Sequence, residues 1–343
     1  MKHSQPRQNA SINVIKFILS QSIVLLHCAM LFGFPRFQGG WIYVEWFYIF
    51  AGYTLAGTIL GLSHDAPVLK TGLRILWKRI RSVFPCYVIS VALGLLVKYA
   101  VGAIEVQSLG DIGKILAEIL MLQMFRIPTA YITGTSWFLS AMWIALIVLI
   151  PIMMVARRKF TRYIAPVMTL AIYFFIQKRT GYLWEPDAWM GFAYKGTLRA
   201  LAGISLGAFA YEIGTGIKDK LSHPVFDSIC IWVVYGLILV LTTLFDDAGW
   251  FYFLPFIFTI LIAVQMNKKD GLDFPDSSAT RLLGKLSMVI YMNHYCLIDT
   301  IEKTFPSMQL DRKILIAFIS ITIAVSIVMF IETTLRKCHV TPN

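Results

Sequence analysis

The sequence predicts an all-α, polytopic integral membrane protein, a bundle of about ten transmembrane helices, and three observations support this fold class. Hydrophobic residues make up 57% of the 343 residues and charged residues 15%, whereas a soluble domain carries about 25% charged and 45–50% apolar residues. The mean hydropathy is +0.69. Long apolar runs recur along the chain, and the basic residues concentrate on one of the two sides that these runs define.

The apolar runs have the length of membrane-spanning helices, which need roughly 20 mostly apolar residues to cross a core of about 30 Å. They are too long for barrel strands and lack the alternation that a barrel requires. We therefore expect residues 10–335 to form a single transmembrane domain, with 1–9 and 336–343 as cytoplasmic tails. The expected spans are 12–32, 41–62, 79–100, 135–155, 162–177, 198–213, 225–245, 250–266, 282–298 and 312–331.

The segment 112–125 is apolar but short, which is more typical of an interfacial or re-entrant segment than of a span. Charge favours this interpretation, because short cytoplasmic loops are enriched in Lys and Arg. If 112–125 does not span, both termini are cytoplasmic and 20 of the 31 basic residues lie inside, among them Arg157, Arg158, Lys159 and Arg162. If it spans, that cluster is forced outside. We therefore expect ten spans with N-in and C-in topology.

The net charge of +12 follows from this topology and from attraction to anionic lipid head groups. Nucleic acid is not an expected partner, because the basic residues are dispersed over several loops. The five cysteines occur singly and form no CxxC pair, so neither a metal site nor a disulfide framework is indicated. They are Cys28, Cys86, Cys230, Cys296 and Cys338.

The first span carries polar residues on one stripe. Asn13, Lys16, Ser20 and His27 follow one another at helical spacing. Ionisable groups inside spans are costly and indicate function. Lys16 and His27 are eleven residues apart, which is roughly 16 Å along a helix axis. Lys16 is expected at the cytoplasmic end, where it could also snorkel to the head groups, and His27 toward the outer end.

Polar residues of two other spans are expected at the depth of His27. Glu45 opens the second span, and a carboxylate beside an imidazole fixes its tautomer and stabilises its charged form. Asn293 and His294 lie near the outer end of the tenth span. Two intramembrane histidines from distant parts of the chain at one depth are difficult to explain by packing alone. Gly52, in contrast, is expected at a close helix-packing position.

A basic cluster lies at the start of the third span, where Lys78, Arg79 and Arg81 lead into a helix that has Pro85 in its first turn or two. These residues fit the positive-inside rule, and they also fit a phosphate clamp, because Arg forks match phosphate oxygens bidentately. Trp137 and Arg199 lie at outer boundaries. Trp137 fits an aromatic belt, and the aromatic and acidic stretch that ends at Arg199 could hold a sugar.

These residues resemble the acyltransferase-3 family of bacterial membrane acyltransferases. The similarity rests on Lys16 and His27, on the Glu45–Tyr53 run with Ala51 where serine is usual, and on Arg79–Tyr87 with Ser82 in place of the usual second arginine. Trp137–Ser140, Arg199–Gly203 and Ser287–His294 match the remaining family blocks. The resemblance covers about residues 10–330.

The resemblance implies transfer of an acyl group, usually acetyl, from cytoplasmic acyl-CoA to a hydroxyl of an extracytoplasmic glycan, either a surface polysaccharide or a lipid-linked sugar. Acetyl-CoA would be a donor substrate rather than a bound cofactor, in the inner membrane of a bacterial cell. His27 would be the general base, with Glu45 and His294 as catalytic partners. Lys16, Lys78, Arg79 and Arg81 would bind the donor, and Asn13, Trp137, Arg199 and Asn293 the acceptor.

A second interpretation stays open. Intramembrane His and Glu residues serve proton-coupled transport equally well, so the chain could export a glycan or a lipid-linked intermediate without acyl transfer. An inactive partner subunit is a further alternative. Release of free CoA in the presence of a glycan acceptor would distinguish an acyltransferase from both.

Overall fold

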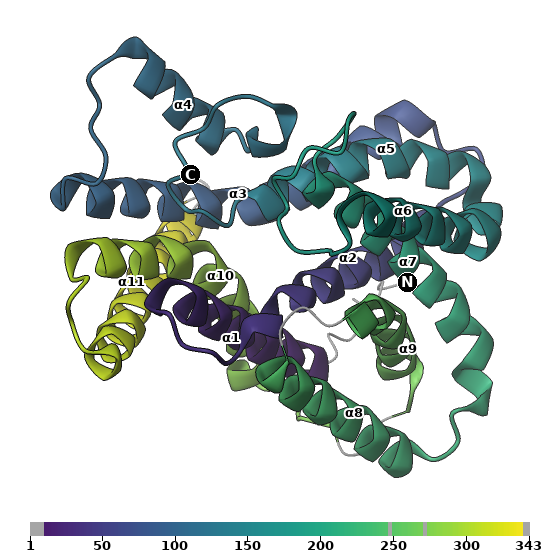
Figure 1. The fold of residues 1–343 in the computed structure, drawn as a ribbon. Helices are drawn as coiled ribbons and strands as arrows, with labels where there is room; N and C mark the ends of the chain where they lie inside the picture. Colours follow the sequence, from purple (N-terminus) through teal and green to yellow (C-terminus); the bar gives the residue numbers. More distant parts are fainter. Residues whose placement is uncertain (1–9, 246–248, 270–272, 339–343) are drawn as a thin grey trace.

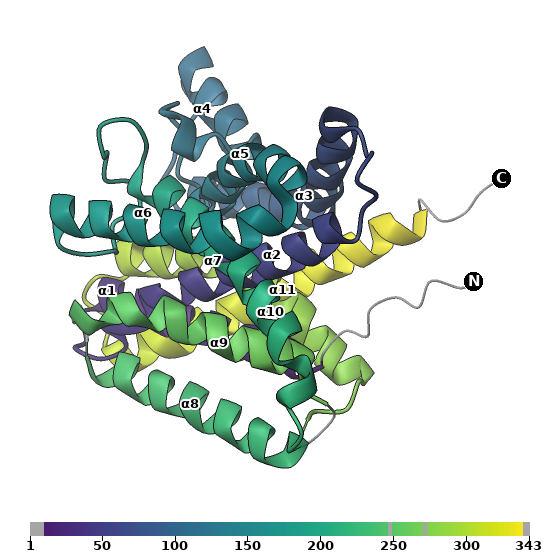
Figure 2. The same cartoon turned by 90° about the vertical axis from the view of Figure 1, so that its right-hand side faces the viewer.

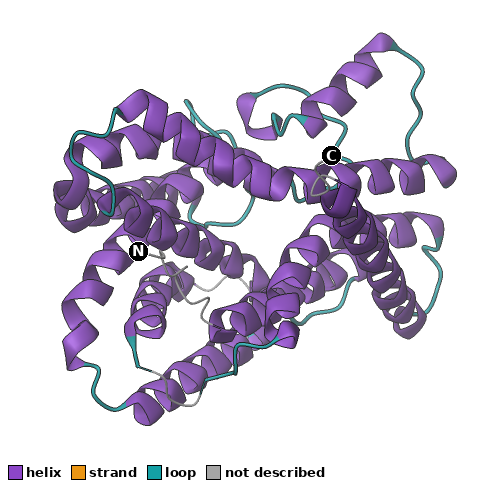
Figure 3. Ribbon diagram, turned by 180° about the vertical axis from the view of Figure 1, so that it is seen from behind, coloured by secondary structure: helices purple, strands orange, loops and turns teal. Residues whose placement is uncertain are grey.

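The computed structural model describes residues 10–245, 249–269 and 273–338, and these residues form helices and connecting loops without a strand (Figure 3). The all-α prediction is confirmed, while the expected tail 1–9 and residues 339–343 lie outside the described residues. The helices are α1 (Ala10–Phe32), α2 (Tyr43–Leu60), α3 (Val68–Ala100), α4 (Leu109–Ile119), α5 (Trp137–Lys159), α6 (Ala165–Thr180), α7 (Lys195–Ile217), α8 (Pro224–Leu244), α9 (Leu254–Asn267), α10 (Ser278–Thr304) and α11 (Leu310–Cys338).

Seven stretches of the described chain are long and apolar enough to cross a membrane. One of them, Trp137–Thr180, comprises α5, α6 and the π-helix η3 (Phe160–Ile164) between them. Each of the ten expected spans overlaps one helix of the structure. The helices α2 and α10 are not among the seven. Both carry polar residues within their apolar sequence, among them Glu45 in α2 and His294 in α10. The number of ten spans and the N-in orientation stay predictions.

The helix α3 begins earlier than the sequence indicated. It starts at Val68, directly after Pro67, and continues for 33 residues through Pro85, which corresponds to roughly 50 Å. Lys78, Arg79 and Arg81 therefore lie well inside a helix, whereas the sequence placed them where a loop enters the third span. The reason is that no Gly or Pro interrupts residues 73–84, so the helix continues beyond the apolar part into basic sequence.

The short helix α4 projects from the bundle at the upper left of Figure 1. Its 11 residues span roughly 16 Å, which is about half of the hydrocarbon core. A capping box between Ser108 and Asp111 begins the helix, and these hydrogen bonds, together with one from Lys114, lower the pKa of Asp111 to about 2. Because its helix has only 11 residues, the segment 112–125, which was expected not to span, is too short to cross the membrane as a helix.

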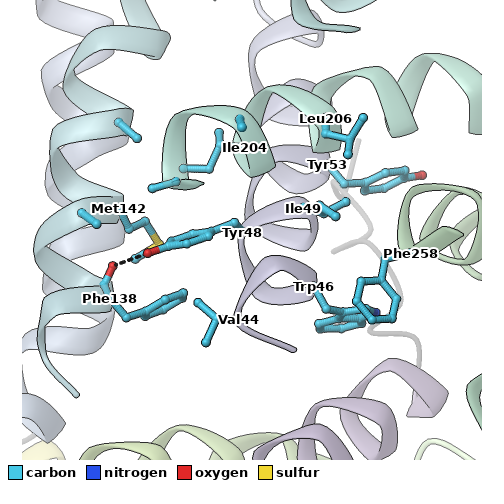
Figure 4. Packing of buried hydrophobic residues seen from close by; sticks show 14 of the residues in the cluster. Val44, Trp46, Tyr48, Ile49, Tyr53, Phe138, Met142, Ile204, Leu206 and Phe258 are labelled. Carbon is cyan, nitrogen blue, oxygen red and sulfur yellow. Dashed lines mark hydrogen bonds between the residues drawn. The ribbon is translucent and has the colours of Figure 1, made fainter. Parts of the chain in front are cut away.

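Glycines bring α2 and α7 into close contact at the centre of the bundle. A Cβ atom on Gly52 would lie 2.0 Å from the Ile204 carbonyl oxygen, and one on Gly207 would lie 1.9 Å from the Ile49 carbonyl oxygen. Gly52 is thus a packing residue, as expected. Around this crossing, Tyr48 stacks on Phe138 of α5 with ring centroids 4.6 Å apart (Figure 4). The close approach positions the first turns of α7 beside the first turn of α2.

The helices α1 and α10 run parallel and in contact along most of their length. Near their first turns Asn13 packs on Gly284, and near the other end His27 meets His294. The helix α8 lies at the edge of the bundle, lowest in Figure 2, beside α9. The helix α1 packs mainly against α10, and also against α2 and α11. We call the end of the bundle that contains His27 and His294 the histidine end. The end that contains Lys16 and Arg79 is the cationic end.

Candidate active site

The two intramembrane histidines are in direct contact. Nδ1 of His27 lies 2.9 Å from Nε2 of His294 and 3.0 Å from the carbonyl oxygen of Ile23. On α10, Nδ1 of His294 lies 3.0 Å from the carbonyl oxygen of Ile290. The expectation that both histidines share one depth is therefore confirmed, and the two rings form a hydrogen-bonded pair.

These contacts determine the tautomers of the neutral pair. A carbonyl oxygen only accepts, so His294 must donate Nδ1–H to Ile290, which leaves its Nε2 as an acceptor. His27 then donates Nδ1–H, shared between His294 and the Ile23 carbonyl. The Nε2 atom of His27 consequently carries a free lone pair. Because no described residue hydrogen-bonds to this atom, it is available as a base.

The surroundings of the two rings differ. His294 is completely buried, whereas His27 is partly exposed. The ring of Tyr295 meets the His27 ring edge-on, with centroids 5.0 Å apart, and Tyr295 is itself partly exposed. Of the pair, His27 is therefore the member that is open to its surroundings, and His294 is enclosed by the bundle.

Glu45 lies elsewhere than expected. Its Oε1 accepts a hydrogen bond from Nε of Arg199 at 2.6 Å, and its Oε2 accepts one from the Tyr173 hydroxyl at 2.9 Å. All its described partners come from α6 and α7, and the carboxylate is fully buried. The expectation that Glu45 flanks the His27 imidazole is therefore not met, because the guanidinium is the stronger partner for a buried carboxylate.

Trp137 completes this second cluster. The Arg199 guanidinium lies 5.6 Å from the Trp41 ring and 5.7 Å from the Trp137 ring, both within cation–π range. Gly203 lets Tyr48 pack between the helices, because a Cβ there would lie 2.6 Å from Tyr48. Two residues expected to bind the acceptor, Trp137 and Arg199, thus lie together with Glu45 in the interior.

The expected donor-binding residues meet at the cationic end. The Lys16 ammonium lies 4.4 Å from the centroid of the Phe50 ring, and Arg79 donates to the Thr54 hydroxyl at 3.4 Å. Phe50 and Thr54 are one turn apart on α2, so both cations converge on the same helix. Lys78 and Arg81 are exposed beside them on α3.

The two asparagines are separated from each other. Asn293 donates to the Ser90 hydroxyl at 2.9 Å and to the Val289 carbonyl, which links α10 to α3. Asn13 packs on Gly284, fourteen residues from His27, or roughly 21 Å along α1. The structure therefore does not bring the four residues expected to bind the acceptor together. No group of three His, Cys, Asp or Glu residues able to hold a metal occurs in the described chain.

Two residues near the site were not predicted. Tyr173 carries no signal in the apolar run of α6, and Tyr295 has none beyond its place directly after His294. The pairing of Glu45 with Arg199, in contrast, has a signal in the sequence. Opposite charges expected at the same end of different spans often pair with one another inside a membrane.

The fold is that of a multi-pass membrane protein, with a hydrogen-bonded histidine pair at one end of its bundle and a group of cations at the other. The profile of the acyltransferase-3 family, described as an acyltransferase domain, matches residues 9–332. The chain therefore belongs to this family, as its motifs indicated. No curated protein and no solved structure matches the chain.

Proposed function

We propose that the protein is a membrane O-acyltransferase of the bacterial inner membrane, which moves an acetyl group from cytoplasmic acyl-CoA to a hydroxyl of an extracytoplasmic glycan. The observation that carries the proposal is the histidine pair. Its hydrogen bonds leave Nε2 of the partly exposed His27 as a free base, and family membership supplies the reaction class.

The distance between the two ends of α1 fits the donor. The phosphates of CoA would bind at the cationic end, where Arg79 and Lys16 approach α2 and Lys78 and Arg81 are exposed. The extended pantetheine arm is on the order of the 16 Å that separates Lys16 from His27 along the helix. The thioester would then lie near the histidine end while the nucleotide stays at the cationic end.

In the transfer step, Nε2 of His27 takes the proton of the acceptor hydroxyl, and the hydroxyl oxygen attacks the thioester carbonyl. The C–O bond forms, the C–S bond breaks, and the imidazolium returns the proton to the CoA thiolate. His294 holds Nδ1–H of His27 in place throughout and shares the charge that develops on the ring. Glu45 takes no part in the transfer step; its carboxylate neutralises the buried Arg199 guanidinium and so stabilises the bundle.

The test is a transfer assay with purified protein, labelled acetyl-CoA and a glycan acceptor, in which free CoA and labelled glycan are measured. Both products are expected in equal amounts with wild-type protein. Movement of the glycan across vesicles without release of CoA would instead support an exporter.

The Arg79→Ala variant examines donor binding in the same assay. The KM for acetyl-CoA is expected to rise far more than the KM for the glycan, because Arg79 is assigned to the phosphates. A truncated donor without the 3′-phosphoadenosine should be much less sensitive to the substitution. Equal losses with both donors would remove Arg79 from the donor site.

A further inference from the structure

Two arginines surround one carboxylate at the junction of α5 and α6. Arg158 lies at the end of α5 and Arg162 in the π-helix η3. Nη1 of Arg158 lies 3.1 and 3.2 Å from the two carboxylate oxygens of Glu212 on α7, and Nε of Arg162 lies 3.1 Å from Oε1. The Thr161 hydroxyl donates to Oε2 at 3.3 Å. Two guanidinium groups are thereby held on one carboxylate, whose side chain is only 9% exposed.

This arrangement leaves positive charge and hydrogen-bond donors at the surface. Two arginines and one glutamate carry a net charge of +2 − 1 = +1, and the two arginine side chains are 62% and 51% exposed. A guanidinium has five N–H donors, and Nε and Nη2 of Arg158 donate to no residue that the structure describes. Both arginines line an open depression of about 410 Å³, together with Glu212, Thr215 and Gly216.

The backbone beside this depression is strained. Arg157 has φ of +44° and ψ of −121°, a conformation that residues other than glycine rarely adopt. Its guanidinium holds the turn, because it donates to the carbonyl oxygens of Leu60, Leu62 and Ser63 at 2.6–3.4 Å. The π-helix follows three residues later. Strained backbone and short π-helices both occur frequently at functional sites, so they are a second indication that the depression binds a ligand.

The position of the depression favours a lipid over a soluble ligand. It lies at the cationic end, because the Arg157 guanidinium contacts Leu60, six residues beyond Thr54 on α2. The neighbouring turns of α5, η3 and α6 carry side chains that are 63–74% exposed, namely Val155, Tyr163 and Val167. In a membrane, exposed apolar side chains face lipid tails and tyrosines concentrate at the level of the head groups. The tails of a lipid whose head group lies in the depression would therefore contact these residues.

We propose that this depression binds the phosphate of an anionic phospholipid, with Arg158 and Arg162 as the phosphate-binding residues and Glu212 as the residue that holds them in position. Arginine suits this task because its planar fork matches phosphate oxygens, and basic pockets between helices on the cytoplasmic side bind anionic head groups. A bound lipid would join η3 to α7 and so stabilise the folded bundle. The inference does not depend on the proposed acyl transfer.

The experiment follows the thermal unfolding temperature of the purified protein in a neutral detergent at low salt, because a ligand that binds the folded state raises this temperature. Short-chain phosphatidylglycerol is the probe. Phosphatidylcholine with the same chains and inorganic phosphate are the comparison ligands. Wild-type protein is expected to be stabilised by phosphatidylglycerol and by neither of the other two at the same concentration.

Arg158→Gln and Arg162→Gln should each weaken the apparent affinity for phosphatidylglycerol by about tenfold, the effect of losing one hydrogen bond to a charged group. Glu212 keeps the other arginine in each variant, so both are expected to fold, and the unfolding temperature without lipid checks this. Lys159→Gln is the matched control, because Lys159 is exposed directly after Arg158 and does not line the depression. The affinity of this control should change by about twofold at most.

Four outcomes would overturn the inference. Wild-type protein that phosphatidylglycerol does not stabilise would lack the site. Equal weakening in Lys159→Gln would assign the attraction to general surface charge, and equal stabilisation by phosphatidylcholine would assign it to the lipid tails. Equal stabilisation by inorganic phosphate would exclude the lipid as the source of the phosphate. None of these outcomes changes the expected release of CoA in the transfer assay, so the proposed function is tested separately.

Discussion

His27 has a free basic nitrogen because of what its other nitrogen contacts. Nδ1 is held by the Ile23 carbonyl and by His294, so the proton stays on that side of the ring. The Ile23 carbonyl alone would fix this tautomer, and His294 adds a second acceptor for the same proton. At the scale of single residues, the pair is therefore the feature on which the proposed base rests.

His27→Ala is expected to lower the rate of acyl transfer by about 10²–10⁴-fold, the usual contribution of a general base, while acyl-CoA binding is retained. His27→Asn should fail equally, because an amide cannot take a proton at neutral pH. His294→Ala should cost less, because it removes the support and leaves the base. Single-turnover kinetics measure all three, and transfer by His27→Ala within a few-fold of wild type would exclude His27 as the base.

Glu45 and Arg199 form a buried ion pair, with side chains exposed by 0% and 2%. Breaking such a pair from one side typically costs about 3–5 kcal/mol, whereas replacing both partners by apolar residues of similar volume is often neutral. Glu45→Gln is therefore expected to lower the thermal unfolding temperature clearly, and Glu45→Leu combined with Arg199→Met to recover most of it. A fully stable but inactive Glu45→Gln protein would instead assign Glu45 to catalysis.

At the scale of elements, α4 and the segment that joins it to α5, residues 120–136, contact the site from outside the main bundle. Glu118 is fully buried, and its Oε1 accepts from the backbone and the hydroxyl of Thr133 and from the Ser136 hydroxyl, at 3.0–3.3 Å. The Thr135 hydroxyl donates to the Tyr291 carbonyl on α10 at 3.0 Å. This segment thereby connects α4 to the part of α10 that carries His294 and Tyr295.

Gly134→Ala tests this connection. Gly134 has φ of +70°, and a Cβ atom there would lie 2.1 Å from the Tyr295 ring, so this ring, which meets the His27 ring edge-on, must shift. A loss of kcat with a folded bundle is expected. Gly113→Ala on α4 is the matched control, since nothing lies within 4 Å of its Cβ and alanine favours the helix. Unchanged kcat in Gly134→Ala would show that Tyr295 is not needed.

The sequence predicted the helices well because their signals are local. Apolar runs between basic or Gly- and Pro-containing loops locate α1, α2 and α5–α11 to within a few residues at most ends. His27 and His294 were expected at one depth, and the structure brings them into contact. The start of α3 was wrong by eleven residues, because a basic amphipathic extension has no apolar signal. Opposite charges at one expected depth indicated that Glu45 and Arg199 could pair, but the contact itself depends on the glycine-mediated approach of α7 to α2, which is a tertiary contact that the sequence does not show.

At the scale of the whole molecule, the histidine end and the cationic end of α1 should face opposite sides of the membrane. The distribution of basic residues predicts that Lys159 faces the cytoplasm and Lys178 the outside. In a cysteine-free background, Lys159→Cys should react with an impermeant reagent only from the cytoplasm and Lys178→Cys only from outside. Both positions are exposed. Labelling of Lys159→Cys from outside would reverse the topology.

The most direct test of the central claim is acyl transfer across a sealed membrane. The protein is reconstituted into vesicles with its Lys159 face outward, labelled acetyl-CoA is added outside, and the glycan acceptor is enclosed. Label is expected on the enclosed glycan, with free CoA outside, and His27→Ala vesicles should show neither. If label reached the glycan only when donor and acceptor shared one side, or if the glycan left the vesicles without acetylation, transfer through the bundle from the cationic end to His27 would be contradicted.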